Sequence, residues 1–148
     1  MAELLSSADW RGGMGFDIHA GDHTFVIDAP EVSGGKNEGP KPTYMLVAGL
    51  MSCTGMDVVL VLKKMRVPLQ KFHMETKTEV ADEDPRVFHK IDLIYHFEGD
   101  KALNDYATNI KKAIQLSRET YCGISIMFSR FCEINYRAFI NDVELELE

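Results

Sequence analysis

One apolar run dominates this sequence, because Met45–Leu62 holds a single charged residue, Asp57. A run of about 18 apolar residues reaches the lower limit of a membrane-spanning helix. This one also contains glycines and small polar residues, and Lys63 and Lys64 close it, so we expect a helix buried inside a soluble protein. One small chain has too few strands to cover a helix that is apolar on every side. The run therefore predicts a homodimer in which antiparallel sheets wrap two central apolar helices.

The segments on either side of this run alternate with period two, which is typical of strands. Met14–Ala20 and His23–Asp28 flank a Gly21-Asp22 turn and predict a hairpin. The remaining predicted elements are a helix over Thr43–Met65, a long antiparallel hairpin of Gln70–Ala81 and Arg86–Phe97, helices over Lys101–Glu119 and Ile124–Arg130, and a strand over Phe131–Ile140. The order ββ-α-ββ-αα-β indicates an α+β fold, and the length fits one domain over residues 1–148.

Net charge and the number of cysteines limit which binding partners and which cellular compartment we expect. The chain carries a formal net charge of -7 and has only isolated lysine doublets, which argues against nucleic acid as a partner. Residues 1–10 lack the basic and apolar regions of a secretory signal, so we expect a cytoplasmic protein without a membrane anchor. Three cysteines are an odd number, and a reducing compartment disfavours a structural disulfide framework.

Two of the three cysteines occupy positions at which thiol chemistry is possible. Cys53 lies inside the apolar helix, with Asp57 one turn later on the same face. Burial raises a thiol pKa, so a reactive Cys53 needs a cation, and Arg11 is a candidate. Cys122 follows a break in the helical pattern, where the N–H groups of a new helix stabilise a thiolate. A redox couple and two buried small hydrophobic residues are both consistent with these positions.

The other chemistry-bearing residues predict structural roles. Cys132 alternates with apolar residues in the last strand and reads as a core residue. The five histidines form no HxH or HExxH pattern and the chain has no CxxC, so we expect neither a metal nor a cofactor. Asp57 needs a partner within its apolar surroundings, which a structural hydrogen bond or a catalytic role would each supply.

Three segments together resemble the OsmC/Ohr family, the osmotically inducible and organic hydroperoxide resistance proteins. They are Pro42–Val59, Pro85–Ile91 and Ala113–Ser125, in the order and spacing of that family. The resemblance covers about residues 10–140 and implies an OsmC-like fold that forms an intertwined homodimer, with the active site at the dimer interface. It also implies a cysteine-dependent peroxidase that reduces organic hydroperoxides and is restored by a dithiol reductant.

The resemblance assigns a role to each matched residue. Cys53 matches the thiol that attacks the peroxide, and Cys122 matches the thiol that resolves the sulfenic acid as a disulfide. Arg11 matches an assisting arginine, and Asp57 is a possible support. The family's assisting carboxylate falls on Thr43 here, which cannot serve as one. That departure favours a non-catalytic protein that binds a small apolar ligand. A redox sensor that forms the disulfide but turns over poorly is a further alternative.

Overall fold

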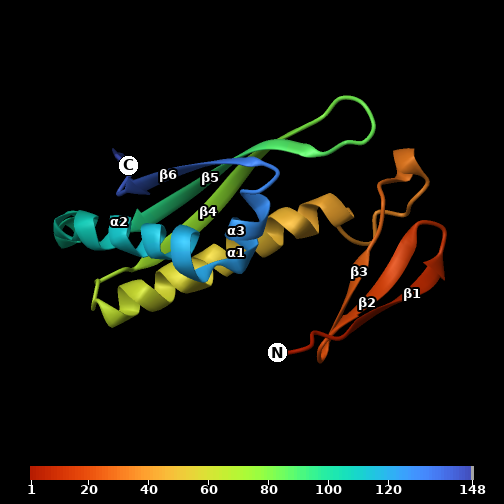
Figure 1. The fold of residues 1–148 in the computed structure, drawn as a ribbon, viewed down its shortest axis with the longest axis horizontal. Coiled ribbons are helices and arrows are strands. Elements are labelled where there is room, and N and C mark those ends of the chain that lie inside the picture. Colours follow the sequence, from red (N-terminus) through yellow and green to blue (C-terminus); the bar gives the residue numbers. More distant parts are fainter. Residues whose placement is uncertain (148) are drawn as a thin grey trace. The chain divides into compact units, whose positions relative to one another are not determined.

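The computed structural model describes residues 1–147. The chain divides into two compact units, Met1–Ala48 and Gly49–Glu148. Each unit is built on its own sheet, and helices accompany the second (Figure 1). The predicted α+β class is therefore confirmed. The prediction of a single domain over residues 1–148 and the homodimer remain predictions.

The first unit contains a three-stranded antiparallel sheet of β1 (Ser6–Gly12), β2 (Gly15–Ala20) and β3 (His23–Ile27), in that order. The hairpin β2–β3 turns at Gly21, whose φ of 58° suits glycine, as predicted. Strand β1 escapes the sequence analysis because most of its residues are exposed, so no buried alternation marks it. A one-turn 3-10 helix, Glu31–Ser33, and a loop then lead to the long apolar helix.

Helix α1 (Pro42–Lys64) begins in the first unit and continues through the second. Pro42 occupies its first turn, where a missing N–H is tolerated. The second unit adds a four-stranded sheet in the order β4-β5-β6-β7, composed of β4 (Lys71–Val80), β5 (Phe88–Glu98), β6 (Glu133–Ile140) and β7 (Val143–Leu145). Only the pair β5–β6 is parallel, because helices connect those two strands.

The core of the second unit lies between this sheet and the helices on one of its faces (Figure 1). Strand β5 is central and directs alternate side chains into the core, including Leu93, Tyr95 and Phe97. Helix α1 contributes Val58 and Leu62 against them. Burying such side chains stabilises the fold by roughly 1.5–3 kcal/mol each. The second unit therefore holds the cysteine-bearing part of α1 firmly against the sheet.

One part of the predicted alternation is wrong at the start of β5. Strict period-two alternation over Arg86–Phe97 would place Val87 and His89 on the same face as the buried Ile91, but both are exposed and Phe88 is buried instead. The pairing with β4 shifts its register between Glu79 and Val80, which moves side chains to the opposite face. A bulge of this kind leaves no mark in the apolar pattern.

The predicted helix over Lys101–Glu119 is three consecutive pieces. A 3-10 helix (Lys101–Tyr106) leads into α2 (Ala107–Leu116), and a π-helical turn (Ser117–Tyr121) follows. The predicted short helix is α3 (Gly123–Phe128). The π-turn adds a residue to the helical ladder just before Cys122, and such turns often occur at functional sites.

Helix α1 is less buried than the sequence predicts. Its most apolar 18-residue window is only 39% buried, and its length and composition would also suit a membrane span. Met56, Val59 and Leu60 stay exposed because the sheet of the second unit covers one side of the helix only.

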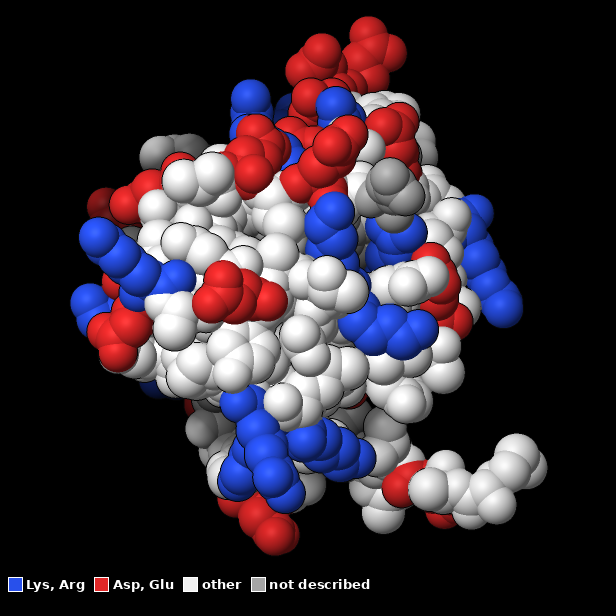
Figure 2. Space-filling view, turned by 90° about the vertical axis from the view of Figure 1, so that its left-hand side faces the viewer, with Lys and Arg blue, Asp and Glu red and all other residues white. Residues whose placement is uncertain are grey.

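On the face of the molecule in Figure 2, acidic and basic side chains are intermixed and no continuous basic stripe is visible.

Candidate functional site

The sulfur atoms of Cys53 and Cys122 lie 2.7 Å apart, although the residues are 69 positions apart in sequence. Cys53 comes from the middle of α1 and is partly exposed, whereas Cys122 precedes α3 and is fully buried. Both cysteines are free thiols in this structure. A disulfide bond is about 2.0 Å long, so a small rotation of either side chain would close one.

The π-turn explains how Cys122 comes to face α1. Its backbone N–H donates to the carbonyl of Ser117, five residues earlier, at 2.8 Å. Cys122 then takes an extended backbone conformation, and its sulfur caps α3 by accepting the N–H of Ser125 at 3.3 Å. The sequence correctly predicts that Cys122 begins a new helix, although the π-turn that aims its side chain was not predicted.

A buried network of hydroxyl groups lies next to the two thiols. Tyr95 Oη is 2.8 Å from Thr54 Oγ1, and Ser117 Oγ lies 2.9 Å from Thr54 Oγ1 and 3.2 Å from Asp57 Oδ2. The Ser117 hydroxyl is placed to donate to Thr54 Oγ1 and to the Asp57 carboxylate, which only accepts, and the Tyr95 and Thr54 hydroxyls share the remaining hydrogen bond. Burial raises the pKa of Tyr95, which keeps its hydroxyl a donor.

Asp57 therefore has the structural hydrogen bond that its apolar surroundings demand. The carboxylate also lies close enough to Cys53 for its charge to act on the thiol. Sequence reasoning found Asp57 but missed Ser117, Thr54 and Tyr95. The available signal was weak: three polar side chains occur at positions whose neighbours are core residues.

Burial raises the pKa of the Cys53 thiol to about 11, and the hydrogen bond with Cys122 adds to this shift. The charge of Asp57 acts in the same direction, while a hydrogen bond from the backbone of Ile124 opposes it. Little thiolate therefore exists at neutral pH in this environment. Because these effects together raise the pKa of Cys53, a nearby cation is needed to stabilise its thiolate, as the sequence analysis expects.

The predicted cation, Arg11, lies on β1 in the first unit and contacts two carboxylates there. Its guanidinium is 3.1 Å from Asp17 and 3.4 Å from Glu38. Glu38 was missed by sequence reasoning, although it lies only four residues before the proline that begins α1. Thr43 is exposed in the first turn of α1. The role of Arg11 toward Cys53 remains a prediction.

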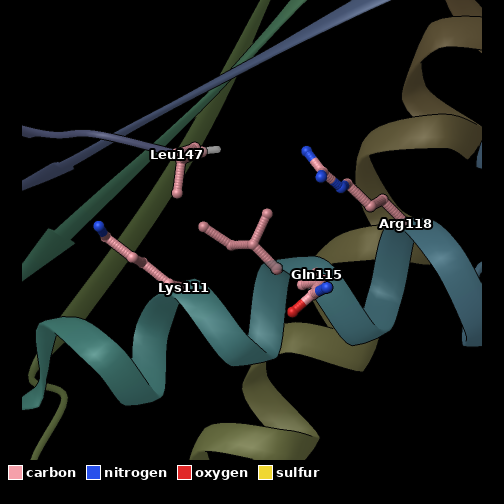
Figure 3. A pocket seen from close by; sticks show the side chains of 5 residues that line it. Lys111, Gln115, Arg118 and Leu147 are labelled. Carbon is pink, nitrogen blue, oxygen red and sulfur yellow. The ribbon is translucent and has the colours of Figure 1, made fainter.

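A separate hollow of about 230 Å³ lies along α2, and none of its described lining residues is a cysteine (Figure 3). Lys111, Gln115 and Arg118 line it from α2 and the π-turn, and Leu147 lines it from the C-terminal segment. The guanidinium of Arg118 also stacks over the Tyr136 ring at 5.5 Å. The thiol pair with its hydroxyl network is therefore the stronger candidate for a functional site.

The chain matches the family model described as OsmC-like protein over residues 35–137. It is 30% identical over 134 residues to protein YhfA of Escherichia coli strain K12, an alignment that covers 90% of this chain and 95% of YhfA.

Solved structures share the fold at lower identity. The OsmC-like protein of Mycoplasma pneumoniae superposes with a TM-score of 0.72 at 14% identity, covering 93% of this chain and 95% of that one. The organic hydroperoxide resistance protein OsmC of Legionella pneumophila gives 0.66 at 16% identity, covering 93% and 97%. The family match spans more than half of the sequence and includes both thiols, so this chain belongs to the OsmC-like family.

Proposed function

We propose that this protein is a cytoplasmic, thiol-dependent peroxidase that reduces organic hydroperoxides and protects against oxidative stress. The observation that carries the proposal is the 2.7 Å separation of the Cys53 and Cys122 sulfurs. Structural relatives named as organic hydroperoxide resistance proteins, from Legionella pneumophila and Bacillus subtilis, support it at the level of the fold.

The unequal burial of the two thiols supports the proposal that Cys53 attacks the peroxide and Cys122 resolves the product. Cys53 is partly exposed and can meet a peroxide, while Cys122 is fully buried beneath it. The Cys53 thiolate attacks the terminal oxygen of R–O–O–H and breaks the O–O bond. The alkoxide leaves and takes up a proton as the alcohol R–OH, and Cys53 becomes a sulfenic acid.

The second step uses the neighbouring sulfur. Cys122 attacks the Cys53 sulfenic acid, the S–S bond forms and water leaves with the proton of the Cys122 thiol. A dithiol reductant then exchanges with this disulfide, so that two thiols are restored and the reductant is oxidised. The cycle needs no metal or other cofactor.

The activating charge comes from Arg11 within the functional homodimer. A nearby guanidinium favours a thiolate, which offsets the burial that raises the pKa of Cys53. Glu38 contacts Arg11 and serves as the assisting carboxylate, because Thr43 has no carboxylate group.

The experiment compares wild type with Cys53→Ser, Cys122→Ser and Cys132→Ser. Stopped-flow mixing with cumene hydroperoxide should show rapid oxidation in wild type and Cys132→Ser, and loss of peroxide consumption in Cys53→Ser. Cys122→Ser should accumulate sulfenic acid, which mass spectrometry detects after trapping. The proposal is wrong if Cys53→Ser consumes peroxide as fast as wild type.

The high pKa of Cys53 favours a second candidate, a redox sensor that forms the same disulfide but turns over slowly. A third candidate, binding of a small apolar ligand, is favoured by a hollow of about 450 Å³ beside Asp57 that Leu60, Val61 and Leu116 help to line. Repeated turnover with dithiothreitol separates the enzyme from the sensor. A ligand-binding protein would resist oxidation of Cys53 by peroxide.

A further inference from the structure

The thiol pair and Asp57 together form a set of ligand atoms that no local sequence motif reveals. The two sulfurs and a carboxylate oxygen lie within 4.8 Å of one another. We propose that the reduced protein binds a thiophilic divalent cation, such as Zn²⁺, through Cys53, Cys122 and Asp57. This site goes beyond the proposed peroxidase, because it requires reduced thiols but no peroxide chemistry.

The ligand atoms are of the kinds that zinc binds, and two separate helices bring them together. Zinc binds cysteine sulfur at about 2.3 Å and carboxylate oxygen at about 2.0–2.2 Å. Cys53 and Asp57 lie one turn apart on α1, so a single helix face presents both. Cys122 approaches from the start of α3. Three ligands leave a fourth position open for water, as in many zinc sites with an exchangeable ligand.

The distance between the two sulfurs shows that metal binding and disulfide formation need opposite movements of the thiols. Two thiolates on one tetrahedral zinc lie roughly 3.7 Å apart, whereas these sulfurs are 2.7 Å apart. The cation must therefore spread the sulfurs by about 1 Å, and a disulfide must draw them together. Both changes use the same lone pairs, so metal binding and disulfide formation exclude each other.

Groups around the three ligands are arranged to support them. The backbone N–H of Ser125 donates to the Cys122 sulfur at 3.3 Å, and the backbone of Ile124 hydrogen-bonds to Cys53. The Ser117 hydroxyl lies 3.2 Å from the Asp57 carboxylate and orients it. Such outer contacts fix the direction of metal ligands and commonly change metal affinity 10- to 100-fold.

The cation also has a path to the ligands. Asp57 lines the hollow of about 450 Å³, together with Leu116, which precedes the π-turn, and Tyr121, which ends it. The carboxylate therefore meets an arriving cation before the buried Cys122 does. Occupancy would withhold both thiols from peroxide, and oxidation to the disulfide would release the cation.

The test uses the reduced, chelator-treated full-length protein and Co²⁺ as a spectroscopic probe of Zn²⁺ sites. We expect roughly one cobalt ion per chain, with the intense near-ultraviolet absorption of thiolate ligands, displaced by Zn²⁺. Cys53→Ser and Cys122→Ser should each remove that absorption, and Asp57→Asn should weaken binding at least tenfold. Cys132→Ser is the matched control, because Cys132 lies outside the ligand set, and it should bind as wild type does.

A second measurement keeps the proposal testable if a variant fails to fold. Zn²⁺ should slow the alkylation of Cys53, the partly exposed thiol of the pair, in the wild-type protein, as followed by mass spectrometry. Absence of stoichiometric binding, or thiolate absorption that persists in Cys53→Ser, would overturn the site. Peroxidase assays are run with a chelator, so loss of the metal site and loss of the peroxidase are separate results.

Discussion

Ser117 is the residue on which the arrangement beside the thiols depends most. It is fully buried, and its single hydroxyl reaches both Thr54 and Asp57. Asp57 is a half-buried carboxylate and Thr54 is fully buried, so removing the Ser117 hydroxyl takes a hydrogen bond from each of them. The integrity of the site therefore rests on a side chain that has no part in the thiol chemistry itself.

We expect Ser117→Ala to lower the free energy of unfolding by about 1–3 kcal/mol, the cost of a buried polar group that loses its hydrogen bond. Urea unfolding followed by circular dichroism measures this value. Ser129→Ala is the matched control, because Ser129 is exposed and donates only to a backbone carbonyl. The control should stay within about 0.5 kcal/mol of wild type. Equal effects of the two substitutions would show that the network contributes nothing.

The sequence identifies the reactive residues of the site better than it identifies the residues that hydrogen-bond to them or pair with them. Cys53, Cys122 and Asp57 stand out because thiols and a carboxylate are conspicuous among apolar neighbours. Thr54 and Tyr95 do not, since a hydroxyl in a helix or strand is compatible with any face until the elements are packed. Glu38 could not be identified from sequence for a similar reason, because its partner Arg11 is distant in sequence.

At the level of elements, the loop between β3 and α1 is fixed by one buried carboxylate. Asp28 accepts the backbone N–H groups of Ala29, Lys36 and Glu38 at 2.8–3.1 Å. These bonds stabilise the ionised form and hold the pKa of Asp28 below its usual 3.8, with the Glu38 bond contributing most. The same loop carries the Glu38 side chain to Arg11.

This loop should therefore contribute stability that depends on pH. A carboxyl whose pKa is lowered by folding stabilises the protein above its unfolded value of 3.8, and the contribution disappears as the pH falls through the lower folded value. Asp28→Asn should reduce the melting temperature at pH 7, and the gap to wild type should narrow at pH 3. Asp22→Asn, in the exposed β2–β3 turn, is the control. A gap that stays constant with pH would contradict the assignment.

The elements that sequence analysis missed share a physical cause. Strand β1 pairs through its backbone while its side chains remain exposed, so no apolar alternation marks it. The register shift near Val80 and the π-turn at Ser117–Tyr121 each add or displace one residue within a regular element. Such changes are set by tertiary contacts, whereas long periodic segments such as α1, β4 and β5 are predictable from their own pattern.

At the scale of the whole molecule, the family and the fold were accessible from sequence, whereas the assembly is still a prediction. The apolar run predicts a helix covered on all sides, yet Met56 is 72% and Leu60 52% exposed. These residues lie four apart on one face of α1, next to Val59. Large apolar side chains gathered on one surface indicate a protein interface. A second copy of the chain is the partner that the family resemblance supports.

If α1 packs against its counterpart in a homodimer, a charge at Met56 should disrupt that contact. We expect Met56→Glu to raise the dissociation constant of the dimer at least tenfold, because a carboxylate loses its hydration on burial without gaining a partner. Analytical ultracentrifugation over a concentration series measures the constant. Peroxide consumption should fall with the dimer fraction, since Arg11 is proposed to act on Cys53 in the assembled protein.

Lys77→Glu supplies the control for this experiment, because it adds the same carboxylate at an exposed position of β4. It should leave both the assembly and the activity as in wild type. A wild-type protein that sediments as a monomer at all concentrations would refute the predicted dimer. A Met56→Glu variant that remains a dimer would place the interface elsewhere and leave the exposed face of α1 to another partner. Because circular dichroism should show unchanged helix content in the variant, loss of the dimer would be separable from loss of the fold.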